Sequence, residues 1–280
     1  MTGSLLATLR NAWRNPSGRS GLLILAALAV FAVAGPWFLP DPAAMPALGQ
    51  GPMAPTLAHP FGTDPTSRDV LARTATGARI SLGIAGLAVV LSLTVGTAVG
   101  LVAGFAGGWW DTLLMRAVDG ALAIPRLFVL LLLLVVWERM PLAALVLVIG
   151  LTGWFGTSRL VRGEVLRLKT AGFVQAAEAL GAARRRTIFH HLLPNAIGVV
   201  LVSATLAIGD VILLEAGLSY LGVGVQPPTP SWGLMVFDAR NDFSAAPWTA
   251  IFPGLAILVT VLAVNLVSDA LRAAFDPRSA

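Results

Sequence analysis

Five long stretches of this chain contain no Asp, Glu, Lys or Arg, and they constrain its fold more than any other feature. They cover residues 20–40, 80–110, 140–158, 187–209 and 243–268. About 20 apolar residues are enough for a helix to cross the hydrocarbon core of a bilayer. Because lipid offers the backbone no hydrogen-bond partner, a crossing segment must be a helix or part of a closed barrel. Barrel strands alternate apolar and polar residues, which these stretches do not, so we predict transmembrane helices.

The charge composition supports the same conclusion. Only 12% of the 280 residues are charged and 56% are hydrophobic, whereas a soluble domain carries about 25% charged residues. The net charge of +5 does not predict a nucleic-acid partner, because the basic residues lie in loops between the apolar stretches. The chain has no cysteine, which excludes disulfides, thiol chemistry and the commonest zinc ligand.

The hydropathy pattern predicts six spans and an all-α membrane protein. The third span is the least regular, because Arg116 and Asp119 lie in its first turns and Pro125-Arg126 interrupts it before residues 127–137. We expect three segments: 1–78 with the first helix and an outer segment, 79–271 as a core of five helices, and a tail at 272–280. The six spans cover about residues 21–39, 80–105, a segment ending at 127–137, 142–160, 196–214 and 250–267.

The N-terminal stretch has some features of a secretory signal peptide. Arg10, Arg14 and Arg19 precede the apolar residues 22–31, and Ala32-Val33-Ala34 has the small residues of a cleavage site. The apolar stretch continues to Pro40, however, and further spans follow it. We therefore expect an uncleaved first transmembrane helix.

The distribution of Lys and Arg predicts the orientation, because cytoplasmic loops carry an excess of both. The segments placed outside hold only Arg68, Arg73, Arg79, Arg139 and Arg240. With six spans, both termini are then cytoplasmic. The loop 161–193 is the most basic of the chain and is placed inside, with Arg162, Arg167, Lys169, Arg184, Arg185 and Arg186.

Three glycines in the second span, Gly96, Gly100 and Gly104, recur at every fourth position. Such a row has no side chains to keep a neighbouring helix away, so two backbones can approach closely. The row predicts tight packing, either within this chain or at an interface with another subunit.

The basic loop contains a row of small residues at helical spacing, followed by basic ones. Such a helix face can enter a groove on a partner protein or lie on anionic lipid. Gly181 is explained either by a partner surface that comes close to it or by a turn with positive φ, and Pro194 is expected to end the helix before the fifth span. The row consists of Ala176, Ala177, Leu180, Gly181 and Arg184.

The same loop resembles the EAA loop of ABC importer permeases. Gln175 stands where the family usually has glutamate, and His191 where it usually has an aliphatic residue. A histidine before an apolar-Leu-Pro-Asn stretch resembles the dipeptide, oligopeptide and nickel branch of the family. The spacing matches the family's throughout, and the residues at its motif positions are Gln175, Ala176, Ala177, Gly181, His191, Leu193 and Pro194.

Other segments resemble the same branch in the same order, which covers the chain from about residue 59 to 278. The first span and the Gly-Thr-Asp sequence at 62–64 resemble the second of the paired permeases in such systems. The segments outside the EAA loop that carry this resemblance are residues 59–64, 68–71, 77–82, 215–222, 226–233, 252–255 and 276–278.

This resemblance implies a type I importer permease of the bacterial inner membrane. It implies a related second permease, two cytoplasmic ATPases that use ATP and Mg, and a periplasmic or lipid-anchored substrate-binding protein, with no cofactor on this chain. Di- or oligopeptides are the expected substrates, and nickel chelates, glutathione or opine-like solutes the alternatives. The resemblance also implies that the loop couples to the ATPases through Gln175, Ala176, Ala177, Leu180, Gly181, Arg184, His191, Leu193 and Pro194.

An enzyme is the first alternative, and the residues argue against it. His190 and His191 are adjacent and therefore point to different sides of a helix, whereas a two-histidine metal site on a helix needs a spacing of four. Ser219 lacks the closing glycine of a nucleophile elbow. The nearest approach to a phosphate-binding loop has Leu168 before Lys169, where glycine is required. Energy must therefore come from a partner.

A channel or a secondary transporter is the second alternative. Such proteins carry ionisable residues inside the membrane for ion coupling, and Asp210 and Glu215 in or near the fifth span are candidates. Either these carboxylates line a translocation path, or they are satisfied by neighbouring groups and a partner subunit.

Overall fold

Helices account for nearly all of the regular structure in the computed structural model, which describes residues 13–45, 51–135 and 140–275. Within these ranges the only β pairing is an isolated bridge between Thr63 and Asp69. The predicted all-α membrane fold is confirmed. The helices are α2 (Pro16–Phe38), α3 (Val70–Ala106), α4 (Gly108–Leu122), α5 (Arg126–Val135), α6 (Leu142–Leu151), α7 (Trp154–Lys169), α8 (Gly172–Ala179), α9 (Arg184–Arg186), the π-helix η1 (Thr187–Leu192), α10 (Leu193–Tyr220), α11 (Trp232–Ala239) and α12 (Trp248–Phe275).

Five helical segments of the described chain, rather than six, are long and apolar enough to cross a membrane. The predicted third span is divided at Pro125 into α4, of 15 residues, and α5, of 10 residues. At 1.5 Å per residue α4 is about 22 Å long and the described part of α5 about 15 Å, against a hydrocarbon core of about 30 Å. Residues 136–139, with Trp137 and Arg139, lie outside the described residues, as do Arg10 and Arg278.

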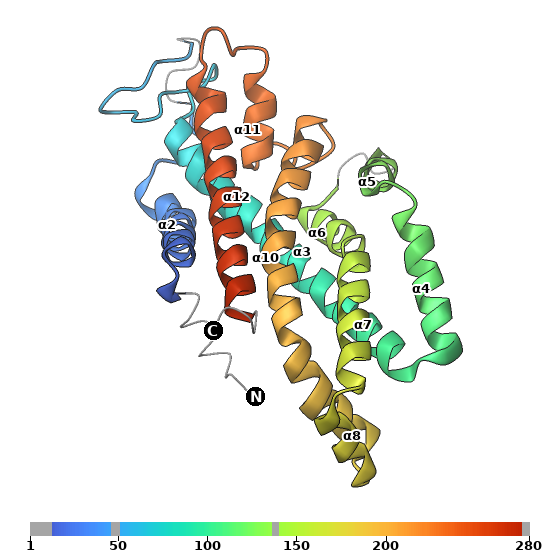
Figure 1. The fold of residues 1–280 in the computed structure, drawn as a ribbon. Helices are drawn as coiled ribbons and strands as arrows, with labels where there is room; N and C mark the ends of the chain where they lie inside the picture. The colour runs from blue at the N-terminus through green and yellow to red at the C-terminus, as the bar shows by residue number, and fades with distance from the viewer. Residues whose placement is uncertain (1–12, 46–50, 136–139, 276–280) are drawn as a thin grey trace.

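The centre of the bundle is α3, a helix of 37 residues that crosses behind α10 and α12 (Figure 1). Its glycine row faces α7. A Cβ atom on Gly96 would lie 2.8 Å from Cβ of Thr157, and one on Gly100 would lie 2.6 Å from the Ser158 carbonyl oxygen. The row therefore serves packing inside this subunit, the first of the two interpretations.

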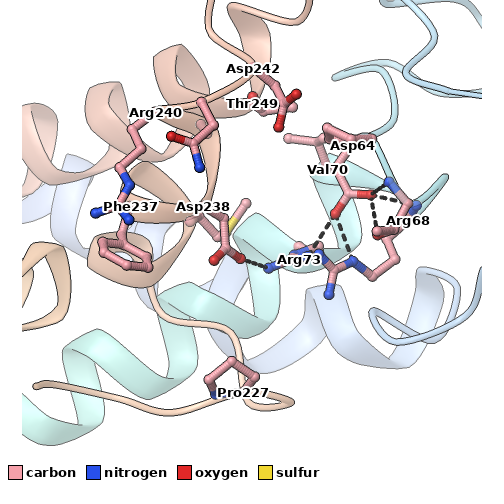
Figure 2. A pocket seen from close by; sticks show the side chains of 15 residues that line it. Asp64, Arg68, Val70, Arg73, Pro227, Phe237, Asp238, Arg240, Asp242 and Thr249 are labelled. Atoms are coloured by element: carbon pink, nitrogen blue, oxygen red, sulfur yellow. Dashed lines mark hydrogen bonds and ion pairs between the residues drawn. The ribbon is translucent and has the colours of Figure 1, made fainter. Parts of the chain in front are cut away.

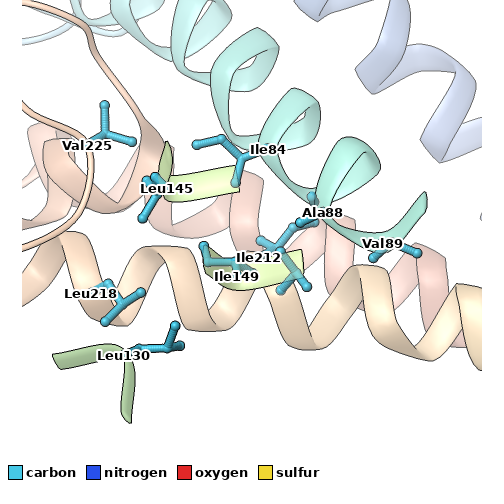
Figure 3. Packing of buried hydrophobic residues seen from close by; sticks show 11 residues of the cluster. Ile84, Ala88, Val89, Leu130, Leu145, Ile149, Ile212, Leu218 and Val225 are labelled. Carbon is cyan, nitrogen blue, oxygen red and sulfur yellow. The ribbon is translucent and has the colours of Figure 1, made fainter. Parts of the chain in front are cut away.

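The largest apolar cluster joins helices from both sides of that centre. It brings Leu130 of α5 beside Leu218 of α10 and Ile149 of α6 beside Ile212 of α10, and α3 contributes Ile84 (Figure 3). Because these side chains are fully or almost fully buried, the cluster anchors α5 and α6 to the apolar core that α3 shares with the C-terminal half of α10. The positions of polar groups on these helices are thereby fixed as well.

The two ends of the molecule differ. At one end, α11 and the segment before α3 lie close together, and at the opposite end α8 projects beyond the bundle from the junction of α7 and α10 (Figure 1). The boundaries of the three predicted chain segments, 1–78, 79–271 and 272–280, remain a prediction.

Candidate coupling and translocation site

The projecting helix α8 is anchored on one side and exposed on the other. Val174 is completely buried and joins the apolar cluster formed by Val161, Val165 and Leu192 at the ends of α7 and η1. On the opposite side Gln175 and Ala176 are exposed, and Leu180, just past the end of α8, is 90% exposed. The chain thus holds a short helix at the end of the bundle with one face available to another molecule.

Gly181 ends this helix, which corrects the prediction of a continuous helical face through Arg184. Its φ is +82°, a value that glycine adopts without the strain other residues meet. The Ala182 N–H donates to the Ala177 carbonyl at 3.0 Å and the Gly181 N–H to the Glu178 carbonyl at 2.9 Å, as in a Schellman cap. Arg184 begins a separate helix. A Cβ on Gly181 would have no neighbouring atom within 4 Å in this chain, so the observed conformation supports the turn.

The prediction that Pro194 ends the helix before the fifth span is wrong. Residues 184–220 form one continuous helical segment, in which η1 precedes Pro194 in the first turn of α10. A π-helix has a wider turn than an α-helix and often marks a functional position. The wider turn accommodates the proline ring, and the Asn195 side-chain amide donates to the His191 carbonyl at 2.6 Å.

The remaining residues predicted for coupling lie where α8 meets η1. The ring of His191 lies 6.4 Å from that of Phe173 on α8, measured between centroids. Ala177, His191 and Leu193 are partly buried, whereas Pro194 is exposed. A displacement of α8 would therefore act directly on η1 and on the helix that continues from it.

Glu215, a predicted candidate for the translocation path, is a packing residue in this structure. Its side chain is 1% exposed and accepts hydrogen bonds from three hydroxyls: Ser81 at 3.0 Å, Ser219 at 2.8 Å and Ser231 at 2.8 Å. Ser231 also caps the N-terminus of α11. The carboxylate thus joins α3, α10 and α11 and is satisfied within the subunit.

Asp210, the other candidate, is exposed on α10. It interacts electrostatically with Arg126, the first residue of α5. Arg126 donates through Nε to Oγ1 of Thr152 at 3.2 Å and through Nη2 to the Ile149 carbonyl at 2.5 Å. In the sequence, Arg126 marks an interruption of the predicted third span and is not among the residues predicted for the translocation path. Its position in the middle of an apolar segment was a signal, because charges within membrane segments are costly and functional by default.

A cavity of about 340 Å³ lies at the opposite end of the molecule from α8, between α11 and the segment before α3. Asp64 pairs with Arg68 and Arg73 at 2.7 Å each, and Arg73 also reaches Asp238 at 3.0 Å (Figure 2). Burial alone would raise the pKa of Asp64, but hydrogen bonds from Thr66 and the Arg68 backbone, with both arginine charges, lower the pKa below its usual value. This ion-pair network fixes the segment before α3 to α11.

Metal-binding groups are not part of this arrangement. Within residues 13–45, 51–135 and 140–275, no group of three or more His, Asp or Glu side chains is placed to hold a metal ion.

Comparison with known proteins gives the family. Residues 96–280 match the model of the binding-protein-dependent transport system inner membrane component family. The oligopeptide transport system permease protein OppC of Haemophilus influenzae is 38% identical over 96% of this chain and 87% of its own length. OppC of Bacillus subtilis is 40% identical over 92% and 84%, and the dipeptide transport system permease protein DppC of the same organism is 37% identical over 98% and 87%. With several helices able to cross a membrane and matches of this extent, the chain belongs to the family of inner membrane components of binding-protein-dependent transport systems.

Proposed function

We propose that this chain is one of two permease subunits of an ATP-driven importer of di- or oligopeptides. The relatives that match nearly its whole length are named as oligopeptide and dipeptide permeases. The structural observation that carries the proposal is the junction of α8 with η1. It gives an exposed helix a direct mechanical connection to α10, the helix that bears Asp210.

The partners follow from the surfaces that the chain leaves exposed. The exposed face of α8 is the proposed contact for a cytoplasmic ATPase, which would bind and hydrolyse ATP with Mg. Nucleotide-driven closure of two ATPases would move α8 and switch the spans between inward-open and outward-open states, a two-state change of the kind that transport requires. The segment before α3 and α11 would then face the substrate-binding protein outside, and both termini would be cytoplasmic.

Co-purification tests the assembly. We expect the purified lone chain to show no ATP hydrolysis, and affinity purification from its native membrane to recover a second permease and ATPase subunits. ATP hydrolysis by the verified lone chain, or a transporter that assembles without ATPases, would contradict the proposal.

A further inference from the structure

Two helix breaks meet inside the region that should span the membrane. The first lies between α4 and α5 at Pro125, and the second is an irregular turn at Thr152-Gly153, between α6 and α7 within the helical segment 142–169. Arg126 connects them through its hydrogen bonds to Thr152 and to the carbonyl of Ile149. At membrane depth, broken helices are tolerated where protein covers the backbone or where they line a water-filled cavity, and they mark binding sites in many transporters.

The guanidinium of Arg126 lies against Gly153, which has no side chain to displace it. A Cβ on Gly153 would lie 3.0 Å from Nη2 of Arg126, so the glycine leaves the room that the guanidinium fills. The Ile149 carbonyl belongs to the last turn of α6, where it also accepts a hydrogen bond from Oγ1 of Thr152 at 3.2 Å, and the C-terminal end of a helix favours a cation. The two hydrogen bonds of Arg126 use two of the five N–H donors of an arginine. The remaining N–H groups of Arg126 are therefore able to donate to an anionic group.

Asp210, on α10, provides a charge opposite to that of Arg126. It is exposed on α10 and interacts electrostatically with Arg126, and no hydrogen bond to its carboxylate is formed within the described part of the chain. Leu130, one turn after Arg126, and Ile212, two residues after Asp210, belong to the same buried cluster (Figure 3). Each charge therefore lies on a helix with a residue in this cluster, Arg126 at the start of α5 and Asp210 on α10.

We propose that Arg126 and Asp210 line the translocation path and bind the two charged ends of a peptide in transit. Arg126 would bind the α-carboxylate, and Asp210 the α-ammonium group. This inference rests on the peptide transport proposed above. A cation or an anion alone would be attracted by one member and repelled by the other, whereas a zwitterion satisfies both. Between substrates, the opposite charge of Asp210 lowers the cost of keeping Arg126 charged within the membrane.

The experiment uses the complete importer in proteoliposomes, with the binding protein loaded to saturation. Four forms of one peptide are compared: free, N-acetylated, C-amidated, and modified at both ends. Asp210→Asn should slow uptake of the free and the C-amidated peptide by about tenfold, as expected for a lost charge-assisted hydrogen bond. The same variant should leave the N-acetylated forms at their wild-type rates. Arg126→Gln should slow the two forms that keep the carboxylate and spare the amidated ones.

Matched variants separate substrate contact from structure. Asp119→Asn neutralises the carboxylate of an exposed ion pair with Arg159 that joins α4 to α7, and it should change the uptake of none of the four peptides. Arg126→Lys keeps the charge without the planar fork, and it replaces Arg126→Gln if that variant fails to assemble. ATP hydrolysis stimulated by loaded binding protein should persist in all variants.

An equal loss for all four peptides, or no loss, would contradict the role of the pair in substrate binding and leave peptide import itself intact. If the wild-type importer moves no form of the peptide with ATP, the proposed function fails as well.

Discussion

Glu215 and Asp210 lie five residues apart on α10, but their environments have little in common. Glu215 is buried and accepts hydrogen bonds from three serine hydroxyls. Asp210 is exposed and interacts electrostatically with Arg126. From the sequence alone, both carboxylates were candidates for the translocation path, because both lie in or near the fifth predicted span. The difference comes from Ser81 and Ser231, which lie on other elements and meet Glu215 only after the chain has folded.

Replacing Glu215 should destabilise the protein. Glu215→Ala leaves three buried hydroxyls without their acceptor, and each unsatisfied group costs about 1–3 kcal/mol. We expect a clear drop in the Tm of the purified complex in detergent, with a smaller drop for Glu215→Gln, which retains an acceptor oxygen. Asp269→Asn is the control, because its carboxylate is exposed near the end of α12, and it should leave the Tm unchanged. A wild-type Tm for Glu215→Ala would refute the packing role.

Gly181 can be tested by a comparison of substitutions. At a φ of +82°, alanine is strained by about 1–2 kcal/mol, whereas asparagine tolerates this conformation better. We expect Gly181→Ala to lower both co-purification of the ATPases and uptake, and Gly181→Asn to have a milder effect. Gly172→Ala, in the first turn of the same helix where a Cβ meets no atom within 4 Å, is the control. Equal behaviour of the two alanine variants would show that the turn is not required.

Among the secondary-structure elements, the long apolar stretches and their order could be predicted from the sequence, because about 20 uncharged apolar residues leave a membrane helix as the main solution. The breaks could not. Small residues continue at helical spacing past Gly181 in the sequence, although helix α8 ends there with a positive φ. A proline at position 194 predicts a helix end, and the sequence does not indicate the π-helix that precedes it. The hydrogen bonds of Arg126 could not be predicted either, because its partners Ile149 and Thr152 lie more than 20 residues later in the sequence.

The packing of α3 against α7 gives a prediction at this scale. A methyl group at Gly100 would lie 2.6 Å from a backbone oxygen of α7, and a backbone atom cannot move away cheaply. Gly100→Ala should therefore reduce the amount of assembled complex in the membrane. Gly86→Ala, in the same helix but with no atom within 4 Å of the added carbon, should not. Wild-type assembly of Gly100→Ala would contradict the close approach of the two helices.

The whole molecule has one basic end and one end fixed by ion pairs. Arg184, Arg185 and Arg186 follow α8, whereas Asp64, Arg73 and Asp238 fix the segment before α3 to α11. Because Lys and Arg concentrate on the cytoplasmic side, we place α8 inside the cell.

Cysteine labelling tests this orientation, since the native chain has no cysteine. A cysteine at Arg185 should resist a membrane-impermeant reagent in intact cells and react after permeabilisation, whereas one at Asp242, beside the outer cavity, should react in intact cells. The reverse pattern would invert the orientation and place α8 out of reach of cytoplasmic ATPases.

Uptake by the reconstituted importer tests the central claim most directly. Proteoliposomes containing this chain, its sister permease and the ATPases are supplied with labelled peptide, with or without the binding protein, and with ATP, a non-hydrolysable analogue or an ion gradient alone. Accumulation of peptide only when ATP and the binding protein are both present is the predicted result. Accumulation driven by the ion gradient without ATP, or ATP-driven import of a nickel chelate but of no peptide, would contradict the account.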